Sequence, residues 1–91
     1  MGALMFILNR PEDIGALVRD RRRVLKISQD ELAARLRVSQ RWVSHLERGK
    51  HTLQLGLVLR VLREVGVDLF AGETEQAYSD IDAIANGSGD F

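Results

Sequence analysis

The sequence between Ser28 and Gly49 carries two helix starts in close succession, and this spacing constrains the fold more than any other feature. Ser28 is followed three residues later by Glu31, which is the capping-box pattern of a helix N-terminus. Ser39 predicts the start of a second helix, which Gly49 is well placed to end. Apolar residues at helical spacing supply the buried face of each helix, namely Leu32, Ala33 and Leu36 in the first and Val43 and Leu46 in the second.

The link between these two helices is too short to let them lie side by side. Only Arg37 and Val38 separate the last apolar residue of the first helix from the cap of the second. Two short helices joined so tightly must cross, and crossing helices with a tight link have helix-turn-helix geometry. The segment is therefore predicted to form a helix-turn-helix.

Two further helices flank this unit, so the predicted fold class is all-α, a compact domain of four helices. Pro11, followed by two acidic residues, marks the start of a first helix that runs to about Leu25. Thr52 predicts the cap of a fourth helix, which ends at Gly66.

The fourth helix is apolar over a wider arc than one core requires. Its apolar residues sweep roughly 200°, about twice the width of a single core-facing stripe. The excess predicts a second buried surface, such as a dimer partner, and the alternative is a helix enclosed by its own small domain. Short terminal strands over 4–8 and 67–70 are predicted to pair either within one subunit or across the dimer. The residues predicted at the dimer interface are Leu57, Val61, Val67 and Leu69.

Charge is divided unevenly along a chain whose net charge is zero. Residues 1–72 hold 13 basic and 8 acidic side chains, a balance of +5, and residues 73–91 hold 5 acidic side chains and no basic one. A basic body with an acidic tail indicates a nucleic-acid partner, although a solvated surface with a solubilising tail gives the same totals. We divide the chain into an N-terminal arm (1–11), a helix-turn-helix domain (12–72) and an acidic tail (73–91) that is expected to be flexible.

Several function classes are excluded by what the sequence lacks. It has no cysteine, and its two histidines stand six residues apart, so neither a disulfide framework nor a metal site is expected. The sequence shows neither a His–carboxylate pair nor a glycine-rich phosphate loop, so neither catalysis nor a cofactor is expected. The apolar start is eight residues long and has no basic lead, which argues against a signal peptide or a membrane span. We expect a cytoplasmic protein that is not an enzyme.

The second helix of the predicted helix-turn-helix has a polar outer face. With its apolar residues turned to the core, the residues left outside are of types that pair with base edges in the DNA major groove: Gln40, Arg41, Ser44 and His45. Residues at the helix starts or just beyond this helix are predicted to bind phosphates: Ser28, Gln29, Ser39, Arg48 and Lys50. The alternative interpretation of His45 is an ordinary surface histidine.

Other residues have a structural interpretation. Trp42 is expected to pack against its own helices rather than to touch DNA, and His51 is expected in a loop. Helix phase points Arg22 of the first helix inward, toward Glu47. The remaining arginines of that run are expected to form a solvated face: Arg19, Arg21 and Arg23.

At these residues the chain resembles the lambda-repressor-like (Cro/C1-type, XRE) family of helix-turn-helix proteins. The shared pattern is Ser-Gln at 28–29, Glu-Leu-Ala at 31–33, Val-Ser at 38–39 and Glu-x-Gly at 47–49, and the resemblance covers about residues 12–66. It implies a buried pair between Glu47 and Arg22. It also implies that Gln29 contacts a phosphate and Gln40 a base. Arg37 replaces the glycine usual in the turn, so strain of about 1 kcal/mol and an adjusted turn are expected there.

A closer resemblance is to HipB-type antitoxins, the DNA-binding partners of HipA-family kinase toxins. It rests on residues 13–22, on Arg41-Trp42, on residues 55–62 and on residues 66–69. The resemblance implies a homodimer that binds a palindromic operator, represses its own operon and binds a kinase toxin. The alternative is a stand-alone transcriptional regulator without a toxin. The candidate toxin contacts are the apolar residues of the tail, Tyr78, Ile81, Ile84 and Phe91.

Overall fold

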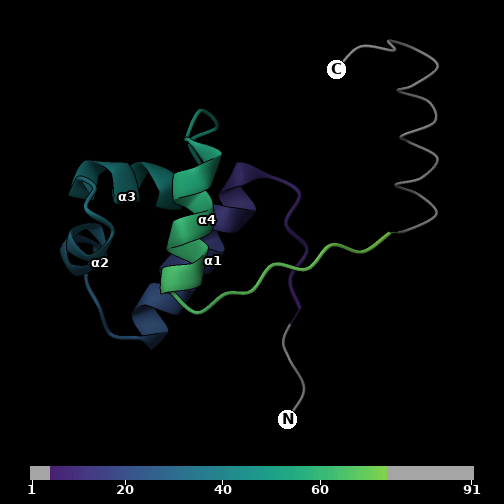
Figure 1. Cartoon of the computed structure of the whole chain (residues 1–91), viewed down its shortest axis with the longest axis horizontal. Coiled ribbons are helices and arrows are strands. Elements are labelled where there is room, and N and C mark those ends of the chain that lie inside the picture. Colours follow the sequence, from purple (N-terminus) through teal and green to yellow (C-terminus); the bar gives the residue numbers. More distant parts are fainter. Residues whose placement is uncertain (1–4, 74–91) are drawn as a thin grey trace.

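The computed structural model describes residues 5–73, which fold into four helices around one core (Figure 1). The helices are α1 (Pro11–Val24), α2 (Gln29–Leu36), α3 (Gln40–Glu47) and α4 (Leu55–Glu64). α3 packs against both α1 and α2, and α4 also contacts α2. The predicted all-α architecture of four helices is therefore confirmed.

Neither predicted terminal strand forms within the described part of the chain. Residues 5–8 and 67–70 have no sheet pairing there, because Leu8 and Val67 pack individually against the helical core instead. Pairing across a dimer stays a prediction. Leu4 lies outside the described residues, and so do the predicted toxin contacts Tyr78, Ile81, Ile84 and Phe91.

Side-chain caps begin two of the helices where the sequence predicts them. The Oγ of Ser28 accepts a 3.0 Å hydrogen bond from the backbone N–H of Glu31. The Oγ of Ser39 accepts one of 3.0 Å from the backbone N–H of Trp42. Pro11 opens α1, where its missing N–H leaves no donor unsatisfied. These starts fix the register of the three helices.

The start of α4 corrects one prediction. Thr52 lies in a turn and does not cap the helix, which begins at Leu55 after an uncapped Gln54. Between them, Leu53 is half-buried against the core. Because the backbone is still extended at Gln54, the helix begins too late for the hydroxyl of Thr52 to reach its first N–H groups.

All four helices end through a residue in the left-handed conformation. Beyond each helix, two backbone N–H groups bond to carbonyls of its last turn in the Schellman arrangement. Gly49 and Gly66 take this position after α3 and α4, with φ of 85° and 80°. Lys26 and Arg37 take it after α1 and α2, both with φ of 58°. Arg37 thus keeps the conformation that a glycine would adopt, and the expected adjustment of the turn does not occur.

The core lies where the four helices converge, and every helix contributes to it. Val43 and Leu46 of α3 are 0% and 3% exposed. Because both point into the core, the opposite side of α3 faces outward. Other buried core residues come from the remaining helices: Val18, Leu32, Val61 and Leu62.

Gly15 allows α1 and α3 to approach each other closely. A Cβ at this position would lie 2.7 Å from the carbonyl oxygen of Glu47 and closer still to that of Leu46. No side chain fits there without moving a backbone. Gly15 therefore sets the spacing between α1 and the C-terminal end of α3.

The exposed apolar residues of α4 are not the ones predicted at the dimer interface. Val61 is 1% exposed and Leu57 is half-buried, so Val61 packs in its own core and is not available to a partner. The exposed apolar side chains of α4 are Leu55 and Leu59, at 68% and 46%. Beyond the helix, Leu69 is 50% exposed. The apolar surface that α4 leaves without a partner in residues 5–73 is thus formed by Leu55 and Leu59.

Candidate nucleic-acid interface

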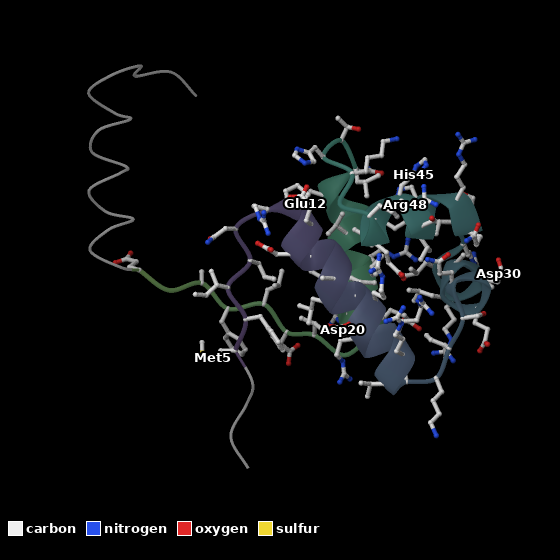
Figure 2. All side chains as sticks on the ribbon, turned by 180° about the vertical axis from the view of Figure 1, so that it is seen from behind. Met5, Glu12, Asp20, Asp30, His45 and Arg48 are labelled. Carbon is white, nitrogen blue, oxygen red and sulfur yellow. The ribbon has the colours of Figure 1, made fainter. Side chains whose placement is uncertain are left out.

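The outer side of α3 presents its polar side chains together. Gln40 and Arg41 are exposed, and Ser44 and His45 are half-buried at the next turn. With Arg48 just beyond the helix, these residues span about 140° of its circumference. Figure 2 shows His45 and Arg48 on this side. The residues predicted to read bases therefore share one side of α3, opposite the core.

A buried ion pair fastens the end of α3 to α1. The carboxylate of Glu47 accepts hydrogen bonds of 2.8 and 3.0 Å from Nε and Nη2 of Arg22, and Glu47 is 3% exposed. Nη1 of Arg22 donates to the carbonyl of Ile27 at 3.1 Å. The pair thus joins α1, the loop after α1 and α3. It fixes the frame in which the outer face of α3 is presented.

Glu47 is charged at neutral pH in spite of its burial. Desolvation opposes the charged carboxylate and would raise its pKa. Hydrogen bonds from Arg22 and Gln29 and the charges of Arg22 and Arg19 outweigh desolvation, so the pKa lies below the ordinary value. The hydrogen bond to Glu47 raises the pKa of Arg22. Both partners therefore keep their charges.

Two arginines that the sequence places on a solvated face make structural contacts instead. Nη2 of Arg19 donates to the backbone carbonyl of Glu47 at 3.1 Å, and its Nε lies 3.6 Å from the carboxylate. Nε of Arg21 donates to the carbonyl of Val65 at 2.9 Å, just beyond α4. Arg23 is exposed, as expected. One signal for Arg19 was present in the sequence, because it precedes Arg22 by three residues on the same helix face.

Hydrogen bonds connect this buried pair to the surface of α3. Nε2 of Gln29 donates to Oε1 of Glu47 at 3.1 Å. Nε2 of Gln40 in turn donates to Oε1 of Gln29. The exposed amide of Gln40 is thus oriented by the protein before a ligand arrives. Prior orientation lowers the entropy cost of using that side chain for recognition.

The residues predicted to bind phosphate lie in three different situations. Ser28 and Ser39 use their hydroxyls as caps, so each leaves the other N–H groups of its first helical turn for an anion. Arg48 and Lys50 follow α3 and are exposed. Gln29 lies at the start of α2, half-buried, with its amide engaged as described above. These groups border the outer face of α3.

Positive charge at this surface is not balanced by carboxylates of the described residues. Among residues 5–73, no Asp or Glu lies within ion-pair distance of Arg41, Arg48 or Lys50. Partial desolvation and the charges of these three cations lower the pKa of His45. His45 is therefore neutral at neutral pH, with one ring nitrogen that donates and one that accepts.

Trp42 and His51 lie where the structural interpretation places them. Trp42 is half-buried against the core. His51 is in the loop before α4, and its Nε2 is 2.8 Å from Oε1 of Glu12. Both residues therefore support the fold around α3.

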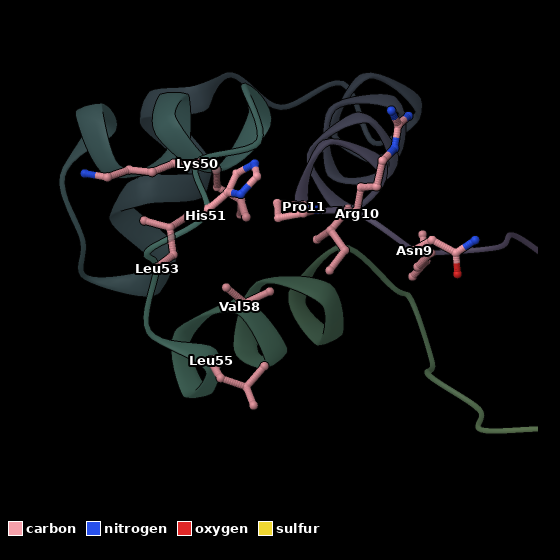
Figure 3. Close-up of a pocket in the computed structure, with 11 residues that line it drawn as sticks. Asn9, Arg10, Pro11, Lys50, His51, Leu53, Leu55 and Val58 are labelled. Carbon is pink, nitrogen blue, oxygen red and sulfur yellow. The ribbon is translucent and has the colours of Figure 1, made fainter. Parts of the chain in front are cut away.

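A groove of about 280 Å³ lies beside that loop, between the starts of α1 and α4 (Figure 3). Its walls are mainly aliphatic, with Lys50 and His51 on one side and Asn9 and Arg10 on the other. Within residues 5–73, no cluster of three or more His, Asp or Glu side chains is placed to hold a metal ion. The same residues contain no helix that is both long and apolar enough to span a membrane.

Comparisons with known proteins agree with this geometry. A family model described as a helix-turn-helix domain matches residues 13–77, which include α2 and α3 and all of α4. An uncharacterized HTH-type transcriptional regulator, y4mF of Sinorhizobium fredii, is 46% identical over 66 residues. That similarity covers 70% of this chain and 87% of the relative.

Proposed function

We propose that this chain, which belongs to the lambda-repressor-like helix-turn-helix family of DNA-binding transcriptional regulators, is a sequence-specific repressor. It binds a palindromic operator as a homodimer. One observation carries the proposal. The polar side chains on the outer face of α3 are of the types that pair with base edges. A two-fold dimer presents two such helices to half-sites about one helical turn apart.

Different polar residues around α3 are suited to base contacts and to phosphate contacts, which supports this function. Gln40 and Arg41 offer amide and guanidinium groups that bond two acceptor or donor atoms of one base, and Ser44 and His45 lie one turn further along α3. The helix starts at Ser28 and Ser39 and the cations after α3 supply phosphate contacts, which set affinity and register. In this arrangement Gln40 reads a base while Gln29 holds it.

Fluorescence anisotropy with a duplex from the promoter of its own gene tests the function. The wild-type chain is expected to bind with strong salt dependence and to prefer this duplex over a scrambled one. In a Gln40→Ala/Arg41→Ala variant, each lost base contact should cost roughly 1–3 kcal/mol of discrimination. The matched control is Gln54→Ala/Arg23→Ala, which removes the same residue types from exposed positions outside α3. Unchanged sequence preference in the α3 variant would overturn the proposal.

We further propose that the chain is a HipB-like antitoxin, which represses its own operon and binds a HipA-family kinase toxin. The support is the resemblance over residues 13–22, 55–62 and 66–69, together with the acidic tail and its apolar residues. A gene for such a kinase beside the gene for this chain is expected. The chain should co-purify with that kinase, and alanine at Tyr78, Ile81, Ile84 and Phe91 should weaken the complex. Failure of the complete chain to bind it would favour the stand-alone regulator.

A further inference from the structure

The cations around α3 differ from four of the nine other arginines of the described chain, because those four have a carboxylate nearby. Arg22 and Arg35 have carboxylates within ion-pair distance, as do Arg10 and Arg19. Arg41, Arg48 and Lys50 have none among residues 5–73, and all three are exposed. We call these three residues the α3 cation surface. It is a concentrated positive surface that is available to an anionic partner.

The imidazole of His45 lies close enough to the α3 cation surface for its pKa to respond to these charges. It is half-buried on α3, and Arg41 and Arg48 stand about one helical turn to either side of it. Desolvation and the charges of Lys50, Arg41 and Arg48 lower its pKa. No acidic residue contributes to this shift. The charges that act on the His45 imidazole are therefore all positive.

The same chain contains a segment of matching chemistry. Residues 73–91 carry five acidic side chains and no basic one, whereas residues 1–72 carry an excess of five positive charges. Within the described residues no comparable excess of negative charge occurs, because their acidic side chains are outnumbered by basic ones. The acidic segment that matches the α3 cation surface in charge is thus part of the same chain.

The segment is long enough to reach the α3 cation surface. The described chain ends at the exposed Glu73, and eighteen residues follow it. Extended, eighteen residues span up to about 60 Å, whereas a domain of this size is roughly 30 Å across. Attachment at this length gives an effective concentration on the order of millimolar. Even weak charge pairing is then substantially populated.

We propose that the acidic segment 73–91 binds the α3 cation surface of its own chain and competes there with DNA phosphates. The inference rests on the proposed DNA-binding function, and it adds a regulatory partner for the same surface. Operator and non-specific DNA both require the segment to leave, so the apparent affinity for both falls by the same factor. Because pairing between the segment and the cations is itself screened by salt, this factor approaches one at high ionic strength.

The binding step is tested without DNA, by NMR titration of the His45 imidazole. The comparison variant neutralises the segment with Glu73→Gln, Glu75→Gln, Asp80→Asn, Asp82→Asn and Asp90→Asn, which leaves the helices of the domain unchanged. At low salt the pKa of His45 is expected to be higher in the native chain than in the variant, because nearby carboxylates favour the imidazolium. High salt is the control, because screening should bring the His45 pKa values of the two chains together. Equal His45 pKa values at low salt, or a His45 difference that disappears on dilution, would overturn binding within one chain.

The competition step is tested by anisotropy with random-sequence and operator duplexes. The neutralised variant is expected to bind both roughly 3- to 10-fold more tightly than the native chain at low salt and equally at high salt. A control chain with the residues of 73–91 in scrambled order should behave like the native chain. Equal affinities of native and neutralised chains would overturn the inference and leave the repressor proposal standing. A His45 response in a chain that binds no DNA would overturn the repressor proposal and the competition together.

Discussion

At the scale of single residues, Glu47 shows how a buried charge positions an exposed side chain. Its carboxylate accepts hydrogen bonds from Arg22 and Gln29, and Gln29 in turn accepts one from the exposed amide of Gln40. A substitution that removes Arg22 would leave a buried carboxylate without its main partner, at a cost of about 3–5 kcal/mol. The pair therefore orients Gln40 on the outer face of α3, although it is itself inaccessible.

The lowered pKa of Glu47 predicts how stability depends on pH. A carboxylate whose folded pKa is depressed stabilises the fold above its unfolded pKa, and this contribution is lost as the pH falls through the folded value. The free energy of unfolding should therefore decrease as the pH falls below 4.5, the ordinary pKa of a glutamate. Urea titrations of Glu47→Gln should show a weaker decrease over that range. Asp13, whose pKa is also lowered, remains in the variant and keeps some of the slope. An identical slope in both chains would contradict the assignment.

Left-handed residues at the helix ends give a second residue-scale prediction. Lys26 and Arg37 hold φ of 58° where glycine has no steric cost. Lys26→Gly and Arg37→Gly should each stabilise the fold by about 0.5–1 kcal/mol in chemical unfolding. Gly49→Ala should destabilise it, since a Cβ there would lie 2.8 Å from Cα of Glu12. If Lys26→Gly and Arg37→Gly both destabilise the fold, the contacts of the two native side chains contribute more free energy than the left-handed conformation costs.

Much of the residue-level picture follows from local sequence, and the exceptions involve distant partners. Ser28, Ser39 and Gly49 could be predicted because a cap depends only on its neighbours. The contact of Arg21 could not, because its acceptor is the carbonyl of Val65, which α4 brings to α1. Thr52 failed as a cap because packing of the residue that follows it delays the helix.

At the level of the helices, the position of the outer face of α3 depends on how α3 lies on α1. Gly15 permits this contact, since any Cβ would overlap the carbonyls at the end of α3. Gly15→Ala should destabilise the fold by about 1–3 kcal/mol and reduce DNA affinity by displacing α3. The matched control is Gly56→Ala in α4, where a Cβ meets nothing within 4 Å. That change should stabilise the fold by about 0.5–1 kcal/mol. Similar effects at the two sites would contradict the close packing of α1 and α3.

Element type could be predicted from periodicity, but the division of the apolar arc of α4 could not. The sequence shows that the arc is too wide for one stripe, yet helix phase alone does not say which edge meets the core. Packing against the other helices buries Val61 and leaves Leu55 and Leu59 exposed. The exposed apolar pair therefore lies two residues before the predicted pair, at the opposite edge of the apolar arc.

For the molecule as a whole, we expect a second copy to bind at this exposed apolar surface. Leu55→Glu/Leu59→Glu would put two charges on it while leaving the buried side of α4 intact. We expect wild type to sediment as a dimer and the variant as a folded monomer with weaker operator binding. The control is Glu64→Lys, a charge reversal of an exposed residue on the opposite side of the same helix. A variant that remains dimeric would place the two-fold contact elsewhere.

The proposed function requires the outer face of α3 to read DNA sequence. Selection from a pool of random duplexes tests it directly, with wild type and Gln40→Ala/Arg41→Ala compared at one salt concentration. Wild type is predicted to enrich one palindromic sequence with half-sites about one helical turn apart. The variant, with its fold verified by circular dichroism, is predicted to lose preference at the positions that these side chains contact. Enrichment of the same sequence to the same extent by both proteins would contradict the claim.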